Sequence, residues 1–184
     1  CGQLEGHPYR DVFSTVYSDD EEGGRFAALA MKGRGRKDIV AVLGPQDNPA
    51  VVDRLRGYRA VLGEDLPDAN VIYTGWNSGD GYQAMHLILA RKIAFDGVLC
   101  GSDRIAAGVI TALNEAGLSV PADVSVVGFD DHEIATRCVP ALTTVRQPLR
   151  EEGHMAANIA LDMIKGAEPT TSVMHMQLIQ RDSL

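Results

Sequence analysis

The segment from Gly97 to Asp131 constrains the fold more than any other part of the chain. It contains two short apolar runs, Gly97 to Gly101 and Val124 to Phe129, separated by residues with helical spacing. Neither run alternates between apolar and polar residues, which is typical of parallel strands covered on both faces. A helix that connects two parallel strands gives a right-handed crossover in nearly all proteins, so both strands should point the same way.

The residues between the two runs predict a helix over 104–116. Its apolar positions recur every three or four residues and form one stripe, made of Ile105, Val109, Leu113 and Ala116. We expect Asp103 to be the N-cap, because aspartate is a preferred residue at that position. Gly117 fits the left-handed position that ends a helix, and Pro121 keeps the helix from resuming.

Polar side chains follow both strands at the point where each strand ends. They are Ser102, Asp103, Asp130 and Asp131. Because the strands are expected to be parallel, these residues should gather at one carboxyl edge of the sheet. Open α/β sheets hold ligands at that edge, so the sequence predicts a binding site there.

The rest of the chain alternates between strand and helix patterns in the same way. Further strands are expected at 14–17, 39–44, 71–73 and 143–146, and further helices at 19–32, 50–62, 78–91 and about 148–165. Residues 1–11 are expected to form a loop, 132–141 an irregular segment, and 173–179 a final strand at a sheet edge. This order is typical of an α/β protein with a doubly wound parallel sheet.

The composition argues against several classes of protein. A net charge of -8 and a pI of about 5.0 argue against contact with a nucleic-acid backbone, which clustered Lys and Arg residues bind. The three cysteines show no CxxC spacing, which favours a reducing, cytoplasmic location over a disulfide framework. No apolar run approaches the roughly 20 residues that span a bilayer, so we expect no membrane contact.

Cys1 followed by Gly2 leaves two interpretations open. A mature bacterial lipoprotein begins with Cys, and a chain shortened at its N-terminus could also begin here. Residues 1–11 have the composition of a loop that begins inside a fold, which favours the shortened chain.

No motif for catalysis, nucleotide binding or metal binding is present. The sequence lacks GxGxxG and GxxxxGK[ST] loops, an HExxH pair and a GxSxG elbow, and its five histidines are scattered. We therefore expect no catalytic residue, no cofactor and no metal. Asp103, Asp130 and Asp131 could supply an acid pair for glycoside hydrolysis, but without a partnering Lys such residues more often cap helices or bind ligand hydroxyls.

Three residues have the side-chain types that a cleft for a small, hydroxyl-rich ligand needs. Asp130 can accept hydrogen bonds from hydroxyls, Arg54 offers a forked donor, and Trp76 follows a predicted strand with an apolar ring. Trp76 could serve the pocket or the core, and Arg54 could instead be an exposed helix residue. We expect a sugar or sugar derivative as the ligand.

Several segments resemble the effector-binding region of the lactose-repressor and galactose-repressor family of bacterial transcription regulators. They are DVSVVGFDD (123–131), PALTTVRQP (140–148), SDRIAAGVITALNEAGLSVP (102–121), DRLRGYRAVL (53–62) and KGRGRKDIVAVLGP (32–45). The resemblance covers nearly the whole chain. Each motif is weak alone, but together they are specific.

The resemblance implies a periplasmic-binding-protein-like type I fold, in which three crossings of the chain join two α/β lobes. It implies one complete C-terminal lobe, formed by 20–146 and 173–184, and part of the N-terminal lobe, formed by 1–19 and 147–172. In this family a helix-turn-helix head reads operator DNA and a small effector binds in the cleft between the lobes. No segment of this chain resembles that head, so contact with operator DNA is expected only through a head absent from it.

The resemblance also assigns roles to individual residues. Arg54, Trp76, Asp130 and Gln147 match positions that line the effector cleft. Ser102 stands where the family commonly has Asn, so a shorter hydroxyl is expected to face the effector.

We also expect a homodimer that forms through the predicted helix over 104–116. Ala106, Ala107 and Ile110 lie off the centre of the buried stripe and are too apolar for a fully solvated face. The family dimerises through this lobe, which adds Arg137 and Cys138 to the expected contact. Packing against another helix of the same lobe is the alternative explanation of these apolar residues.

Three functions remain open at this point. The first is the effector-binding and dimerisation module of a DNA-binding regulator. The second is an extracytoplasmic sugar-binding protein of a transport system, and the third is an enzyme that uses Asp130. The sequence preceding Cys1 would separate the first two, because a helix-turn-helix head indicates regulation and a leader peptide indicates transport.

Overall fold

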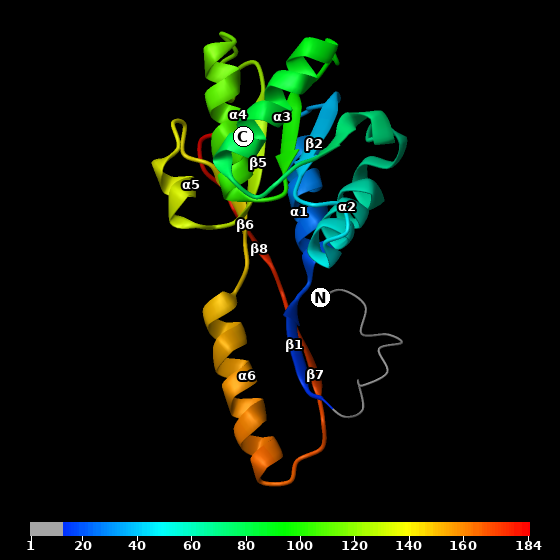
Figure 1. The fold of residues 1–184 in the computed structure, drawn as a ribbon, viewed down its shortest axis with the longest axis vertical. Helices are drawn as coiled ribbons and strands as arrows, with labels where there is room; N and C mark the ends of the chain where they lie inside the picture. Colours follow the sequence, from blue (N-terminus) through cyan, green and yellow to red (C-terminus); the bar gives the residue numbers. More distant parts are fainter. Residues whose placement is uncertain (1–12) are drawn as a thin grey trace.

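The computed structural model describes residues 13–184, and its helices and strands form two units of unequal size (Figure 1). The larger unit is a six-stranded sheet with helices on both faces. The smaller unit contains α6 (Leu149–Ile164) and a pair of strands, β1 (Thr15–Ser18) and β7 (Thr171–Met174). Cys1 and the loop expected at 1–11 lie outside the described residues.

The strand order of the larger sheet is β3-β2-β4-β5-β6-β8. Its members are β2 (Ile39–Leu43), β3 (Val71–Tyr73), β4 (Gly97–Cys100), β5 (Ser125–Asp130), β6 (Thr143–Arg146) and β8 (Gln177–Ile179). Neighbouring strands are parallel except β8, which pairs antiparallel with β6 at the edge. The predicted doubly wound parallel sheet is thereby confirmed.

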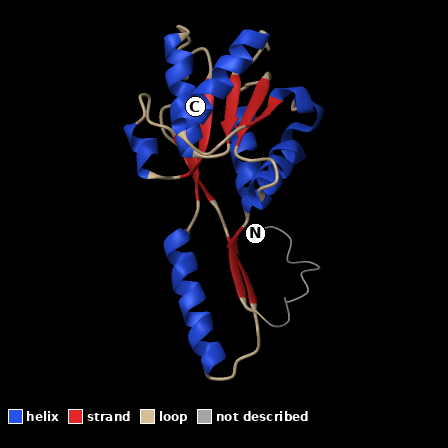
Figure 2. Cartoon of the chain, in the orientation of Figure 1, coloured by secondary structure: helices blue, strands red, loops and turns tan. Residues whose placement is uncertain are grey.

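Helices cover both faces of this sheet (Figure 2). On one face α1 (Asp20–Gly33) and α2 (Pro49–Leu62) enclose one apolar core, and on the other α3 (Ser78–Arg91) and α4 (Asp103–Glu115) enclose a second. Successive residues of β2 point to opposite faces, so Ala41 joins the first core and Val40 the second. Burial on both faces explains why these strands read as continuous apolar runs.

Three crossings connect the two units, namely β1 to α1, β6 to α6 and β7 to β8. All three lie near the carboxyl ends of the parallel strands of the larger sheet, where the ligand site is expected. No residue of α6 is buried in this structure. The expected lobe boundary at 172 falls inside β7, and the division into lobes stays a prediction.

Two predicted segments were wrong. The final strand expected at 173–179 is two strands, because the chain leaves β7 and joins β8 in the other sheet. Met176 marks the change, since its side chain enters the first core and its backbone N–H donates to Glu22 at 3.0 Å. The segment expected to be irregular contains the short helix α5 (Glu133–Arg137), which buries Ala135 against the second core.

The two helices α1 and α2 approach each other closely at two glycines. A Cβ atom on Gly24 would lie 2.4 Å from the carbonyl oxygen of Arg54, and one on Gly57 would lie 2.2 Å from that of Glu21. Contacts of this length do not occur, so the two helices could not pack at this distance with any larger residue. This packing places Arg54, on α2, against the first turn of α1.

Replacing Gly57 by Ala should therefore destabilise the protein by about 1–3 kcal/mol, because the added methyl group forces the helices apart. Gly33→Ala is the matched control, since a Cβ there meets nothing within 4 Å and the helix propensity of alanine is higher. Urea unfolding followed by circular dichroism measures both changes. Equal stability of the two variants would contradict the close helix contact.

Candidate functional site

The carboxyl ends of the parallel strands bring the expected site residues to one edge. Asp130 is the last residue of β5 and pairs with Arg146 of β6, so Gln147 follows directly beside it. Ser102 follows β4, the neighbour of β5 on its other side. Arg54 reaches the same edge from α2, with its guanidinium donating to the carbonyl of Gly101.

The side chain of Arg54 is almost fully buried and has four contacts at this edge. Its Nε–H donates to Oδ1 of Asp20 at 2.8 Å, and Nη1 lies 3.7 Å from Oδ1 of Asp130. The guanidinium carbon lies 3.7 Å from the ring centroid of Phe129. The alternative that Arg54 is an exposed helix residue is wrong, because α2 turns this side chain toward the sheet.

Asp130 borders open space while remaining tied to the protein. Its Oδ1 accepts a hydrogen bond from Nε2 of Gln147 at 2.6 Å, and about a third of the side chain is exposed, at 32%. Burial raises the pKa of Asp130, and the nearby Arg54 and the bond from Gln147 partly offset this rise. A carboxylate with an exposed oxygen can accept hydrogen bonds from a ligand's hydroxyls.

Asp130 and Asp131 both have positive φ angles, of 108° and 56°. Non-glycine residues rarely adopt such angles, which cost about 1–3 kcal/mol each and often occur at functional sites. Asp131 is held by Arg146 at 2.6 Å and by Arg181. Burial would raise the pKa of Asp131, but the bonds from Arg181 and Arg146 outweigh it and leave the pKa lowered.

Trp76 lies over Gly44, beyond the carboxyl end of β2. A Cβ on Gly44 would come within 2.5 Å of the indole ring, so only glycine permits this placement. The ring is half-buried and packs against both apolar cores. Trp76 thus has a core role and remains partly exposed at the same edge of the sheet.

Ser102, rather than Asp103, caps α4. The hydroxyl of Ser102 accepts from the N–H of Ile105 at 3.2 Å, and the residue is 4% exposed. The hydroxyl can donate one further hydrogen bond. The expectation that Asp103 is the N-cap was wrong, because the helix begins one residue earlier and Asp103 points away from its first turn.

Asp103 instead braces the turn that carries Asp130 and Asp131. Its carboxylate is fully buried and accepts hydrogen bonds from the backbone N–H of His132, at 2.7 Å, and from the hydroxyl of Thr144. Burial raises the pKa of Asp103 to about 7, and the two hydrogen bonds limit the rise. No local pattern indicates this role, because the donors come from residues far along the chain.

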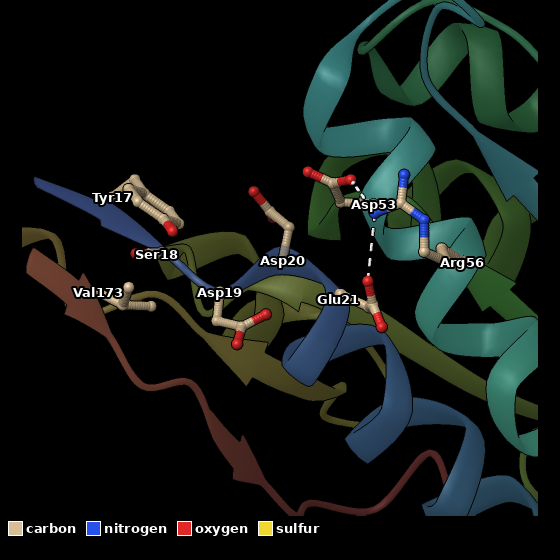
Figure 3. Close-up of a pocket in the computed structure, with 8 residues that line it drawn as sticks. All are labelled: Tyr17, Ser18, Asp19, Asp20, Glu21, Asp53, Arg56 and Val173. Carbon is tan, nitrogen blue, oxygen red and sulfur yellow. Dashed lines mark hydrogen bonds and ion pairs between the residues drawn. The ribbon is translucent and has the colours of Figure 1, made fainter. Parts of the chain in front are cut away.

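A hollow of about 210 Å³ lies where β1 meets α1 and α2 (Figure 3). It is lined by Tyr17, Ser18, Asp19, Asp20, Glu21, Asp53, Arg56 and Val173. Arg56 pairs with Asp53 at 2.8 Å and Glu21 at 3.2 Å, as the dashed lines in Figure 3 show. Asp20 was not among the predicted site residues, although it belongs to a run of acidic residues, 19–22, that follows the strand expected at 14–17.

A second hollow, of about 400 Å³, borders Asp130. It is lined by Asp130, Asp131, Arg146, Gln147, Pro148, Leu149, Arg150, Glu151, His175 and Gln177. Apart from Asp130 and Asp131, these residues lie in or beside the segments that lead to α6 and β8. Asp130 and Gln147 therefore stand between the larger and smaller units.

The arrangement is suited to binding rather than to catalysis by paired acids. Asp131 is bound by two arginines and Asp103 is enclosed, so Asp130 is the member of this trio that faces open space. Within residues 13–184 no group of three or more His, Cys, Asp or Glu side chains could hold a metal ion. None of the helices in that range has the length and apolar composition needed to span a bilayer.

The residues expected at a dimer contact are only partly accessible. Ala106 is fully buried and Ile110 is 3% exposed, so both pack in the second core of their own chain. Ala106 is therefore not available as a contact surface, because α3 and the sheet already cover it. Ala107 is half-buried and lines a hollow of about 310 Å³ together with Ile110, Arg137 and Cys138.

Comparisons with known proteins agree on the family. The periplasmic binding protein-like domain family matches residues 28–184. The HTH-type transcriptional repressor PurR of Escherichia fergusonii is 35% identical over 184 residues, which cover 97% of this chain and 54% of that protein. PurR of Pectobacterium atrosepticum is 36% identical with the same coverage. The chain is a periplasmic binding protein-like domain of the LacI/GalR family.

Solved structures of LacI/GalR-type regulators have the same fold. The transcriptional regulator CelR in complex with cellobiose superposes with a TM-score of 0.89 at 34% identity, covering 95% of this chain and 55% of that one. A LacI family regulator from Enterococcus faecalis V583 with bound ribose has a TM-score of 0.85 at 31% identity, with coverages of 92% and 62%. The LacI/GalR-type domain spans about half the length of the curated relatives it matches.

The stability of this domain should depend on pH through Asp103. The folded-state pKa of about 7 is above the usual value of 3.8, so the folded state binds a proton that the unfolded state has lost. The stabilisation from Asp103 is therefore complete below about pH 4 and is lost as the pH rises toward 7. Between pH 5 and 7.5 the unfolding free energy of wild type should fall by about 2 kcal/mol relative to Asp103→Asn.

Urea unfolding of both proteins at the two pH values measures this difference. The contributions of other titrating groups to the pH dependence of the unfolding free energy cancel in this difference, because they are common to wild type and variant. A difference between the two proteins that stays constant with pH would contradict a protonated Asp103 in the folded state.

Proposed function

We propose that this domain is the effector-binding and dimerisation module of a LacI-type DNA-binding transcriptional regulator. A small polyhydroxylated effector, a sugar or sugar derivative, binds at the carboxyl edge beside Arg54, Asp130 and Gln147. Its binding shifts the two units relative to each other and so changes the affinity of the regulator for its operator. Coupling of this kind is typically about 1–3 kcal/mol.

The observation that carries this proposal is the convergence of Arg54, Asp130 and Gln147 from three different elements on one edge. The carboxylate of Asp130 lies within hydrogen-bonding or ion-pairing reach of both the forked donor of Arg54 and the amide of Gln147. They border the crossings that connect the two units. A ligand bound there would therefore contact the segments about which one unit could move relative to the other. The ring of Trp76 supplies an apolar face at the same edge.

The relatives support a sugar as the effector and regulation as the role. CelR binds cellobiose in its solved structure, and the Enterococcus faecalis regulator binds ribose. The repressors and regulators among the matches favour regulation over transport and over catalysis. Contact with DNA is assigned to a helix-turn-helix head, and such a regulator works in the cytoplasm.

Replacing Asp130 by Ala should weaken the binding of a cognate sugar by about tenfold or more, because a charged hydrogen-bond partner is lost. Arg54→Ala should have an effect at least as large, since it also removes the partner of Asp20. Isothermal titration calorimetry against a panel of free sugars measures both. Arg59→Ala is the matched control, because Arg59 lies on the same helix but pairs with the exposed Asp68.

Unchanged affinity in both Asp130→Ala and Arg54→Ala would show that the sugar does not bind at this edge of the sheet. Loss of affinity in Arg59→Ala as well would indicate a general effect of altering α2 rather than a lost ligand contact.

The dimer should form through the surface around Ala107, Arg137 and Cys138. A two-fold axis places the same patch on both partners, and Ala107→Glu would bring two like charges together across it. The variant should be monomeric at concentrations where the parent is dimeric, as measured by sedimentation. Ala60→Glu, the same change on an exposed position of α2 on the opposite face of the sheet, should leave the dimer intact.

A parent that is monomeric at tens of micromolar, or an Ala107→Glu variant that still forms dimers, would count against this surface. Burial of Ala106 and Ile110 within the chain limits the contact to residues beside them.

A further inference from the structure

We infer that the proposed site accepts an uncharged polyol and rejects its phosphate ester, and that Asp20 sets this selectivity. The inference rests on the proposed function, because it concerns the ligand class of the same site. Asp20 matched none of the cleft positions that the family resemblance assigned, and its role follows from its contacts in this structure.

The buried cation of the site is already neutralised by the protein. Arg54 donates to Asp20 at 2.8 Å and lies 3.7 Å from Asp130, so two carboxylates share one guanidinium. The side chains of Arg54 and Asp20 are only 5% and 9% exposed. An incoming ligand therefore meets an excess of negative charge.

The neighbouring hollow offers no spare cation. Three further carboxylates line it beside Asp20, namely Asp19, Glu21 and Asp53, as Figure 3 shows. Arg56 is the one cation among its eight lining residues, and it already pairs with Glu21 and Asp53. A phosphate entering from this side would face carboxylates rather than a free guanidinium.

The hollow that borders Asp130 contains two groups that could attract an anion, Arg150 and His175, and the His175 ring lies 3.1 Å from Glu22. Arg150 is exposed in the first turn of α6, where the helix dipole favours negative charge. Two carboxylates, Glu151 and Glu152, occupy the same turn. Arg146, which also lines this hollow, pairs with Asp131. The fixed charges on this side are therefore balanced as well.

A neutral polyol matches this arrangement better than an anion does. Its hydroxyls can donate to the carboxylates of Asp20 and Asp130 and can accept from the guanidinium of Arg54. A phosphate group brings a charge of about −1.5 to −2 and offers only acceptors to those carboxylates. Repulsion in a partly buried site should weaken its binding by at least about tenfold.

The test compares ribose with ribose 5-phosphate and glucose with glucose 6-phosphate by calorimetry. If the wild-type protein binds a member of either pair, it should bind the free sugar at least about tenfold more tightly than the phosphate ester. Asp20→Asn keeps an oxygen that accepts a hydrogen bond from Arg54 but removes the negative charge. It should therefore reduce the ratio of free-sugar affinity to phosphate-ester affinity by about fivefold or more. Asp68→Asn makes the same change at an exposed carboxylate that lines neither hollow and should leave the ratio nearly unchanged.

Several outcomes would overturn the inference. One is a phosphate ester that binds wild type as tightly as its free sugar does. If Arg150→Ala then abolishes the binding of that ester, the phosphate group binds at α6. Another is an unchanged ratio in a folded Asp20→Asn protein. If that variant does not fold, the ratio of the affinities for free sugar and phosphate ester is measured in wild type at increasing salt concentrations. Repulsion weakens as salt increases, so a ratio that stays constant would contradict the inference.

The proposed function fails in a different way. Binding of phosphate esters alone would overturn the selectivity but leave the effector site in place. Binding of neither free sugars nor their esters would overturn the effector site for this ligand class, and the selectivity with it.

Discussion

The buried ion pair between Arg54 and Asp20, with Asp130 close by, is the interaction on which the rest of the site depends. A buried guanidinium without carboxylate partners would cost several kcal/mol, so its position is tied to both residues. Asp20 opens α1, Arg54 lies in α2 and Asp130 ends β5. One interaction therefore fixes two helices and a strand at the carboxyl edge of the sheet.

Close helix packing makes this ion pair possible. The glycine contacts at Gly24 and Gly57 allow α2 to approach the first turn of α1, where Asp20 lies. Phe129 supports the guanidinium from below, and Asp103 holds the strained turn that carries Asp130. Stability and ligand binding therefore depend on the same few contacts, which surround the crossings between the two units.

Much of this fold could be predicted because the buried strands and amphipathic helices have strong local patterns. The strand Val71–Tyr73 and the helix Ser78–Arg91 have the expected bounds. The failures arose where distant contacts decide the structure. Residues 173–179 have the composition of one strand, but the pairing of β7 with β1 and of β8 with β6, with Met176 held by Glu22 between them, divides them between two sheets.

The candidate site was predictable in the same limited way. Strand ends indicated Ser102 and Asp130, side-chain type suggested Arg54 and Trp76, and the resemblance added Gln147; all of them lie at the carboxyl edge. The role of Asp20 could not be predicted, because nothing local distinguishes it from Asp19, which caps α1. Asp103 was assigned to the cap because its sequence context suits that role, whereas its donors His132 and Thr144 come from elsewhere in the chain.

The fluorescence of Trp76 tests most directly whether the effector binds at this edge. Trp76 is the only tryptophan in the sequence, so its emission reports on a single place. Its half-buried ring lies against Gly44, beside Gly101, whose carbonyl binds Arg54. A sugar that binds by calorimetry should change this emission saturably and with the same dissociation constant. Calorimetric binding that leaves the emission unchanged would contradict the placement of the ligand at the carboxyl edge.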